Sequence, residues 1–167
     1  MKAAPAPGSE GVPETARHAI AELLDDYVAA LDEDNLEAWP EFFSNDGQYK
    51  VLSRENVSLG LPAPLMYYYS RGMMRDRVRA LREALTYQPV FSRHICAAPR
   101  FRAGKARDVL VTSNFSVYHT TEEGVTQLFT TGQYVDVIAL TKSEPRFRSR
   151  TVTMDTFGVR NLIAVPL

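Results

Sequence analysis

Proton transfer is the chemistry that the ionisable side chains of this 167-residue chain suit best, and His94 with Asp26 is the candidate pair. His94 lies in a stretch typical of a β-strand, and Asp26 lies in one typical of a helix. A histidine facing a carboxylate in a cavity suits an isomerase or a dehydratase. The competing interpretation is a structural histidine and a solvated aspartate, which we favour because isolated residues of this kind are usually structural. Asp26 lies about 100° around the helix from Tyr27, which leaves its direction open.

Metal binding is not predicted for this chain. His18, His94 and His119 share no short ligand spacing, and Cys96 is the single cysteine. One cysteine cannot build an iron–sulfur cluster that needs two cysteines and two histidines. We expect Cys96 to be a small buried apolar residue of a strand. No serine lies in a nucleophile elbow, and no glycine-rich phosphate loop follows a strand.

The net charge of −1 and the pI near 6.3 predict no affinity for nucleic acid or for an anionic membrane surface. Charge is nevertheless segregated: residues 22–46 hold nine acids and no Lys or Arg, whereas residues 71–107 hold ten bases and two acids. Such segments usually face each other or face a partner. The single cysteine, the lack of an apolar run of about 20 residues and the lack of a secretory signal lead us to expect a cytoplasmic protein.

Three helices are predicted before and between the strands. The first begins near Pro13, a short second one is capped by Asp34 with Glu37, and the third begins after the N-cap Ser70 and ends before Gln88-Pro89. Apolar stripes at helical spacing indicate one buried face on the first and third helices. These stripes are Ile20, Leu24, Tyr27 and Leu31, and Met74, Val78, Leu81 and Leu85.

Five strands are expected, at residues 48–52, 92–102, 109–119, 125–140 and 146–157, with residues 53–69 irregular. Helices followed by a run of strands indicate the α+β class. The predicted architecture is a strongly curved, mostly antiparallel sheet of five or six strands with three helices on its concave face. We expect residues 1–12 to be a disordered tail and residues 13–167 to be one domain.

The arginine-rich third helix and the tyrosine run before it are candidate contacts with another protein. Tyr and Arg are enriched at protein interfaces, and the near-neutral total charge argues against a nucleic-acid surface. The candidate interface residues are Arg71, Arg75, Arg79, Tyr67, Tyr68 and Tyr69.

From about residue 15 to residue 167 the chain resembles the small (beta) subunits of aromatic-ring-hydroxylating Rieske dioxygenases. Six stretches carry the resemblance through their order and spacing. They are Trp39-Pro40-Glu41-Phe42-Phe43, Arg77-Val78-x-x-Leu81-Arg82, Ser92-Arg93-His94, Asn114-Phe115-x-Val117-Tyr118, Gly132-x-Tyr134-x-Asp136 and Val165-Pro166-Leu167. The most similar group acts on aromatic acids, as salicylate 5-hydroxylase and terephthalate dioxygenase do.

The resemblance implies a cone-shaped fold like that of nuclear transport factor two, also called cystatin-like. It implies a trimer of this chain within a heterohexamer of three large and three small subunits. The large (alpha) subunit of such enzymes holds the Rieske 2Fe–2S cluster and a mononuclear Fe(II), and a reductase or ferredoxin supplies electrons. The small subunit is implied to be structural, without cofactors or catalytic residues. The same fold includes isomerases and dehydratases, which keeps the His94/Asp26 alternative open.

Overall fold

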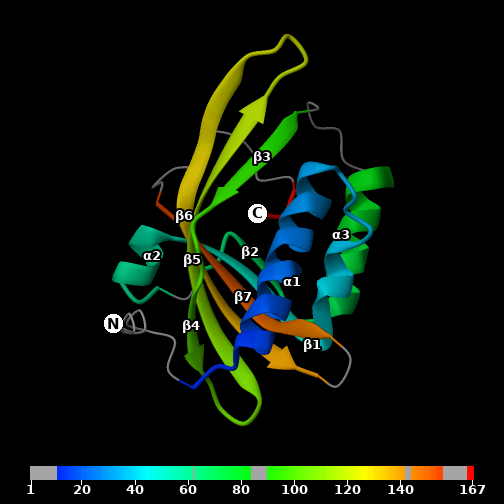
Figure 1. The fold of residues 1–167 in the computed structure, drawn as a ribbon. Coiled ribbons are helices and arrows are strands. Elements are labelled where there is room, and N and C mark those ends of the chain that lie inside the picture. Colours follow the sequence, from blue (N-terminus) through cyan, green and yellow to red (C-terminus); the bar gives the residue numbers. More distant parts are fainter. Residues whose placement is uncertain (1–10, 62, 84–89, 142–143, 156–164) are drawn as a thin grey trace.

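The described residues form one curved sheet of seven strands, and two long helices pack against its concave face (Figure 1). The computed structural model describes residues 11–61, 63–83, 90–141, 144–155 and 165–167. Its elements are α1 (Glu14–Asp32), η1 (Trp39–Phe42), β1 (Phe43–Ser53), α2 (Arg54–Ser58), β2 (Met66–Tyr68), α3 (Arg71–Glu83), β3 (Phe91–Cys96), β4 (Arg100–Ala103), β5 (Asp108–Thr120), β6 (Thr126–Leu140) and β7 (Pro145–Met154).

The strand order is β2-β1-β7-β6-β5-β3, with β4 also paired to β5. Every pairing is antiparallel except β1 with β7, which is parallel. Two differences from the prediction raise the number of strands. The segment predicted to be irregular contains α2 and β2, and the predicted strand 92–102 is divided into β3 and β4 around Pro99, which has no N–H for a continuous ladder.

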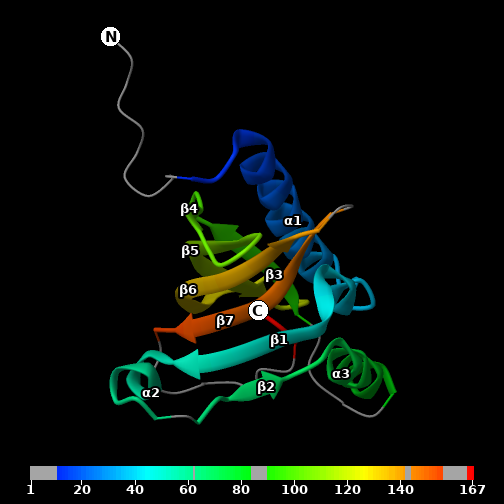
Figure 2. The same ribbon diagram turned by 90° about the horizontal axis from the view of Figure 1, so that it is seen from below.

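The curvature of the sheet comes from its longest strands. The register between β5 and β6 shifts at Val117/Tyr118, and the register between β6 and β7 shifts at Val137/Ile138. Irregularities of this kind bend a strand and increase its twist. Figure 2 shows the strands fanning from β1 to β5 with α1 and α3 at the same end of the sheet.

The buried face of α3 confirms part of the predicted stripe, because Met74, Val78 and Leu81 are all buried. Ser70 caps the helix through its hydroxyl, which accepts the Met73 N–H at 3.3 Å. Leu85 and the predicted break at Gln88-Pro89 lie outside the described residues.

On α1, which follows Pro13 as predicted, Ile20, Tyr27 and Leu31 are buried and Leu24 is half-buried. Val12, assigned to the tail by the sequence, is buried in the core, and residues 1–10 lie outside the described part.

The predicted second helix is reduced to one 3₁₀ turn, η1. Asp34 does not cap a helix with Glu37, since Asp34 adopts φ +56° and both carboxylates bind Arg82 on α3. Tertiary ion pairs have replaced the local capping box. The helices expected on the concave face correspond to α1, η1 and α3, while α2 lies on the other side of the sheet in Figure 1.

Aromatic rings fill the core between α1, η1 and the sheet. Trp39 packs edge-on against Phe43 and Tyr49, and its Nε1–H donates to the Tyr27 hydroxyl at 3.2 Å. The Tyr27 hydroxyl donates to the main-chain oxygen of Leu167 at 2.9 Å, and the Leu167 N–H donates to the Tyr49 hydroxyl at 2.8 Å. Hydrogen bonds with the buried side chains of Tyr27 and Tyr49 therefore hold Leu167 in the core.

Candidate functional site

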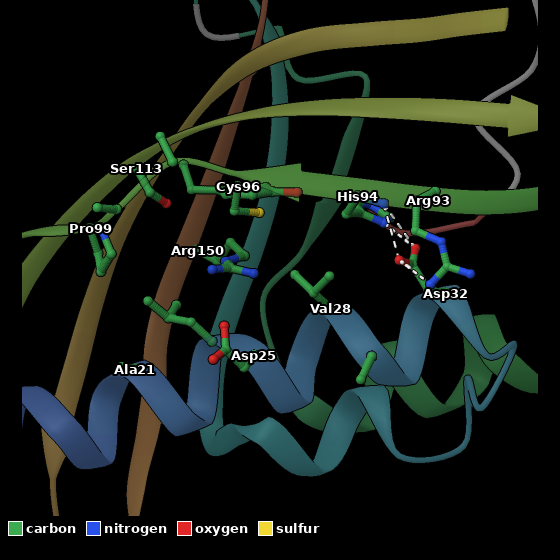
Figure 3. Close-up of a pocket in the computed structure, with 15 residues that line it drawn as sticks. Ala21, Asp25, Val28, Asp32, Arg93, His94, Cys96, Pro99, Ser113 and Arg150 are labelled. Carbon is green, nitrogen blue, oxygen red and sulfur yellow. Dashed lines mark hydrogen bonds and ion pairs between the residues drawn. The ribbon is translucent and has the colours of Figure 1, made fainter.

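A pocket of about 510 Å³ lies between α1 and the strands β3, β5, β6 and β7 (Figure 3). Helix α1 forms one wall with Ala21, Val28 and neighbouring residues, and the sheet forms the other. Polar side chains from both walls reach the pocket. They are Asp25 and Asp32 on α1, Arg93 and His94 on β3, Ser113 on β5 and Arg150 on β7.

The His94 side chain is held by Asp32, in the last turn of α1. Nδ1 of His94 lies 2.6 Å from Oδ1 of Asp32, and both side chains are nearly inaccessible, at 2% and 4% exposed. The His94 main-chain N–H also donates to the two Asp32 oxygens at 3.2 and 3.1 Å. An ionised carboxylate only accepts, so Nδ1 carries a hydrogen, and in the neutral form of the ring the lone pair is on Nε2.

Asp26 does not face His94, so the alternative of a His94/Asp26 pair is not formed. It lines a second pocket of about 400 Å³ together with Glu41 and Arg146. Asp26 and Asp32 are six residues apart, which places them on different faces of a helix with 3.6 residues per turn. The histidine therefore pairs with the carboxylate that the helix turns toward β3.

Arg150 and Asp136 form a buried ion pair at the floor of the pocket. Nε and Nη2 of Arg150 donate to the two Asp136 oxygens at 2.9 and 2.8 Å, and the side chains are 1% and 0% exposed. The guanidinium carbon lies 4.1–4.4 Å from the ring centres of Tyr27, Tyr134 and Phe147. Burial raises the pKa of Asp136, and the Arg150 charge opposes that rise.

The sequence hypotheses missed this pair. The motif Gly132-x-Tyr134-x-Asp136 places the acid on the inward face of a strand, and Arg150 lies on the same inward face of its strand as the buried Val152. The sequence did contain a signal, because each of the two strands has a charged residue at an inward position. Only the register of β6 with β7 makes Asp136 and Arg150 partners.

Three buried polar atoms of the described residues around this pocket have no hydrogen-bond partner. They are Nε2 of His94, Nη1 of Arg150 and the Tyr134 hydroxyl. Buried polar groups are nearly always hydrogen-bonded, so these three atoms are available for hydrogen bonds with a ligand.

Cys96 is exposed and lines the pocket, which corrects the prediction of a buried apolar residue. It lies at the end of β3, where the strand leaves the sheet. Partial burial raises the pKa of the Cys96 thiol.

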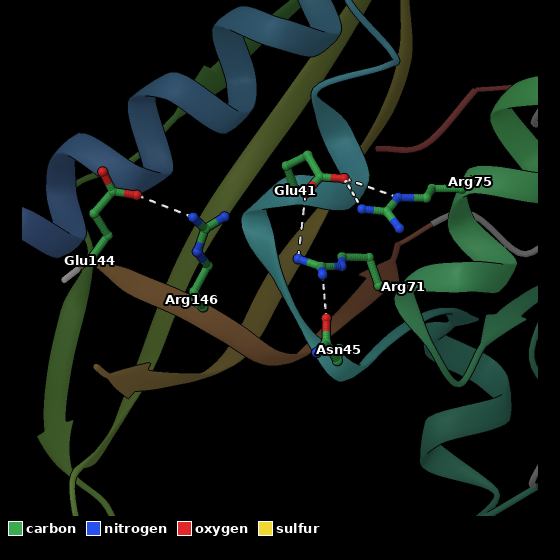
Figure 4. A network of polar contacts seen from close by, with 6 residues as sticks. All are labelled: Glu41, Asn45, Arg71, Arg75, Glu144 and Arg146. Atoms are coloured by element: carbon green, nitrogen blue, oxygen red, sulfur yellow. Dashed lines mark hydrogen bonds and ion pairs between the residues drawn. The ribbon is translucent and has the colours of Figure 1, made fainter. Parts of the chain in front are cut away.

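The acidic and basic segments of the chain face each other. Glu41 on η1 binds Arg75 at 2.6 Å and Arg71 at 3.4 Å (Figure 4). Arg82 binds Asp34 at 2.7 Å and Glu37 at 2.9 Å. These ion pairs between the acidic segment and the basic segment attach α3 to the residues that follow α1.

The six candidate interface residues differ in exposure and in whether their side chains already bind another residue. Arg71 and Arg75 bind Glu41, whereas the Arg79 side chain is 68% exposed with Asp76 at 3.9 Å. Tyr68 is half-buried and stacks on Tyr49. Exposed rings are left at Tyr67 and Tyr69, which are 40% and 61% exposed.

Neither His18 nor His119 lines the pocket. Among the described residues, no group of three or more His, Cys, Asp or Glu side chains is arranged to hold a metal ion. No helix within the described ranges is long and apolar enough to cross a membrane.

The fold and pocket define a class of α+β cone proteins, and comparisons with known proteins place the chain within it. The sequence profile described as "Ring hydroxylating beta subunit" matches residues 27–161. The chain belongs to this family, as its sequence motifs predicted.

Two curated relatives are similar over most of their length. The chain is 33% identical to the anthranilate 1,2-dioxygenase small subunit of Burkholderia cepacia, covering 87% of this chain and 90% of the relative. It is also 33% identical to the terephthalate 1,2-dioxygenase terminal oxygenase component subunit beta 1 of a Comamonas species, covering 84% and 92%.

Solved structures agree with this assignment. A crystal structure of a beta subunit assigned to an aromatic-ring-hydroxylating dioxygenase of Novosphingobium aromaticivorans is similar at TM-score 0.84 and 37% identity, covering 92% of this chain and 98% of that one. A protein from the same organism assigned as a scytalone dehydratase shares the fold at TM-score 0.67 and 15% identity, covering 89% of each chain. The predicted cone fold is confirmed.

The relatives also decide between the two functions considered. The chain is a beta subunit of a multicomponent aromatic-ring-hydroxylating dioxygenase, an oxidoreductase, and a beta subunit implies an alpha-subunit partner. The alternative of a stand-alone isomerase or dehydratase rests on fold likeness alone.

Proposed function

We propose that this chain is the assembly subunit of a dioxygenase that oxidises an aromatic acid. It forms a trimer and holds three alpha subunits in a three-plus-three heterohexamer. The alpha subunit carries the Rieske 2Fe–2S cluster and the mononuclear Fe(II), and a reductase or ferredoxin supplies the electrons. The observation that carries this proposal is the family match over residues 27–161, and the two relatives named for anthranilate and terephthalate support an aromatic acid as the substrate. We place the complex in the cytoplasm.

Exposed apolar side chains between α2 and α3 supply one contact surface. Five of them, here called the 59–69 surface, are at least 40% exposed: Leu59, Leu61, Leu65, Tyr67 and Tyr69. Tyr67 belongs to β2, an edge strand of the sheet, and the other four precede or follow this strand in the chain. Large exposed apolar groups concentrated in one segment are typical of protein contact sites. Arg79 of α3 adds an exposed cation that is free to reorient toward a partner.

The opposite edge of the sheet supplies a second contact surface, the β3 face. Phe91, Ile95 and Leu128 are 69%, 57% and 54% exposed. The strand registers place all three on the same face, opposite to His94. Two separate surfaces are what a subunit needs when it binds both its own copies and a different chain.

The remaining candidates contribute indirectly. Arg71 and Arg75 hold Glu41, and Tyr68 packs on Tyr49 beneath Tyr67 and Tyr69. These three residues shape the surface and fix the orientation of α3, whereas Arg79, Tyr67 and Tyr69 are the ones available to a partner.

Co-expression with the adjacent large subunit tests the proposal. Light scattering after size exclusion is expected to show a six-chain complex that contains iron and oxidises an aromatic acid in the presence of its reductase. The large subunit expressed without this chain is expected to be inactive or aggregated. A purified chain that stays monomeric and never co-purifies with the large subunit would contradict the proposal.

Surface variants assign the contacts. Tyr69→Arg and Ile95→Arg place a charge in each surface, and His18→Arg on the exposed side of α1 is the control. We expect each of the first two variants to abolish one association, either with the alpha subunit or between copies, and the control to assemble normally. Full assembly of both variants would exclude these surfaces as contacts.

A further inference from the structure

We propose that the pocket between α1 and the sheet is a binding site for a small neutral aromatic alcohol of the phenol class. Such a site goes beyond the assembly role, because it lies in a subunit for which no ligand is otherwise expected. The proposal rests on two unpartnered polar atoms, on the charges that line the pocket and on its dimensions.

The first polar atom is Nη1 of Arg150. The side chain is 1% exposed, its other two nitrogens are occupied by Asp136, and rings cover the guanidinium plane. Nη1 is buried without a partner, and Arg150 lines the pocket (Figure 3). An unmet donor on a buried cation is costly, and a ligand oxygen that accepts from it removes that cost.

The second polar atom is Nε2 of His94, which lines the same pocket and is also buried without a partner. Nδ1 faces the Asp32 carboxylate and donates to it, so in the neutral form of the ring Nε2 is an acceptor. The sheet wall of the pocket therefore offers a donor from β7 and an acceptor from β3. A hydroxyl group meets both, since its oxygen accepts from Arg150 and its hydrogen is donated to His94.

The lining charges argue for a neutral ligand. The cation of Arg150 is neutralised by Asp136, and Asp32 is surrounded by His94 and by Arg93 at 3.5 Å. Asp25 is exposed at the pocket, and no described residue forms an ion pair with it. The remaining charge at the pocket is negative, so a carboxylate ligand is repelled there and a neutral hydroxyl compound is not.

The volume and walls suit one aromatic ring. About 510 Å³ falls in the range of roughly 300–1,000 Å³ that small-molecule pockets occupy. Ala21, Val28 and the ring of Tyr134 provide apolar surface around the polar atoms.

Calorimetric titration of the full chain, purified without the large subunit so that only its own pocket is present, tests the proposal. The probes are phenol, anisole and benzoate, which differ in one substituent. We expect phenol to bind, and both anisole, which lacks the hydroxyl hydrogen, and benzoate to bind at least about tenfold more weakly. Failure of phenol to bind, or equal or tighter binding of benzoate, would overturn the proposal.

Two variants of the same helix locate the site without disturbing the Arg150–Asp136 pair. Ala21→Phe fills this pocket, whereas Ala19→Phe places the same ring at the other pocket, from an equally half-buried position. We expect Ala21→Phe to weaken phenol binding at least about tenfold and Ala19→Phe to leave it unchanged. Equal phenol affinity in the two variants would show that phenol binds elsewhere.

Discussion

The carboxylate of Asp32, at the end of α1, accepts from both the main chain and the ring of His94 on β3. The contacts span 2.6–3.2 Å, and both side chains are almost fully buried. These contacts link the first helix to the edge strand of the cone, and they direct Nε2 of the histidine away from Asp32.

Asp32→Asn is expected to destabilise the chain, because the amide is neutral and cannot accept through both of its terminal atoms. Hydrogen bonds to charged groups contribute about 1.5–3 kcal/mol each, so we expect a loss of about 2 kcal/mol in the free energy of unfolding. Asp26→Asn, on the same helix, is the matched control and is expected to change the free energy by less than about 0.5 kcal/mol. Denaturant unfolding at one fixed protein concentration measures both; equal losses would contradict the assigned partner.

Asp136→Leu is expected to be among the most damaging changes, because it leaves the Arg150 cation buried without its counter-ion. Breaking a buried ion pair on one side costs about 3–5 kcal/mol. The double variant Asp136→Leu/Arg150→Met removes both charges and is expected to recover most of that loss. Thermal and denaturant unfolding of the single and double variants give the comparison. A double variant no more stable than Asp136→Leu would show that the pair does more than balance charge.

Gly132→Ala is expected to destabilise the sheet where β6 pairs with β5 and β7. An added Cβ would lie 2.1 Å from the Thr153 carbonyl oxygen and 3.0 Å from the Phe115 ring, so backbone has to move. Overpacking of this kind costs about 1–3 kcal/mol or more. Gly72→Ala is the control, since the nearest atom there is the Ser70 hydroxyl oxygen at 3.7 Å. We expect the control to raise the free energy of unfolding slightly, if at all, and comparable losses in the two variants would contradict the steric argument.

Acid is expected to loosen the attachment of α3. The hydrogen bonds from Arg82 hold the pKa of Glu37 at about 2, below its ordinary 4.5. A lowered folded-state pKa stabilises the fold above the unfolded pKa, and this contribution disappears as pH falls from about 4.5 toward 2. Because Glu37 is exposed, the effect is below about 1 kcal/mol and is screened by salt.

The measurement is the melting temperature of wild type and Glu37→Gln between pH 6 and pH 2. The difference is expected to be present at pH 6 and to vanish at the acidic end. Glu33→Gln, at an exposed carboxylate for which the described residues show no ion pair, is expected to follow the wild type throughout. A difference that persists unchanged at pH 2 would contradict the role of the ionised Glu37.

Local patterns were enough for the two long helices and the long strands. Met74, Val78 and Leu81 recur at helical spacing, and the inward Val109, Val111, Phe115 and Val117 alternate along β5, because burial of one face imposes the same period on the sequence. The α+β class, the curved sheet and the family followed from these patterns and from the order of the motifs. The division of 92–102 into two strands, the short strand β2 and the loss of the second capping box did not follow, since tertiary partners outweigh weak local preferences there.

The sequence by itself determined the pattern of apolar residues, the distribution of charge and the family to which the chain belongs. Only the tertiary structure decided the partners. His94 pairs with Asp32 and not Asp26 because the rotation of α1 against β3 selects one helix face. Arg150 meets Asp136 because the register of β6 and β7 brings two inward positions together. Pairings between distant segments depend on packing angle and strand register, which no local pattern contains.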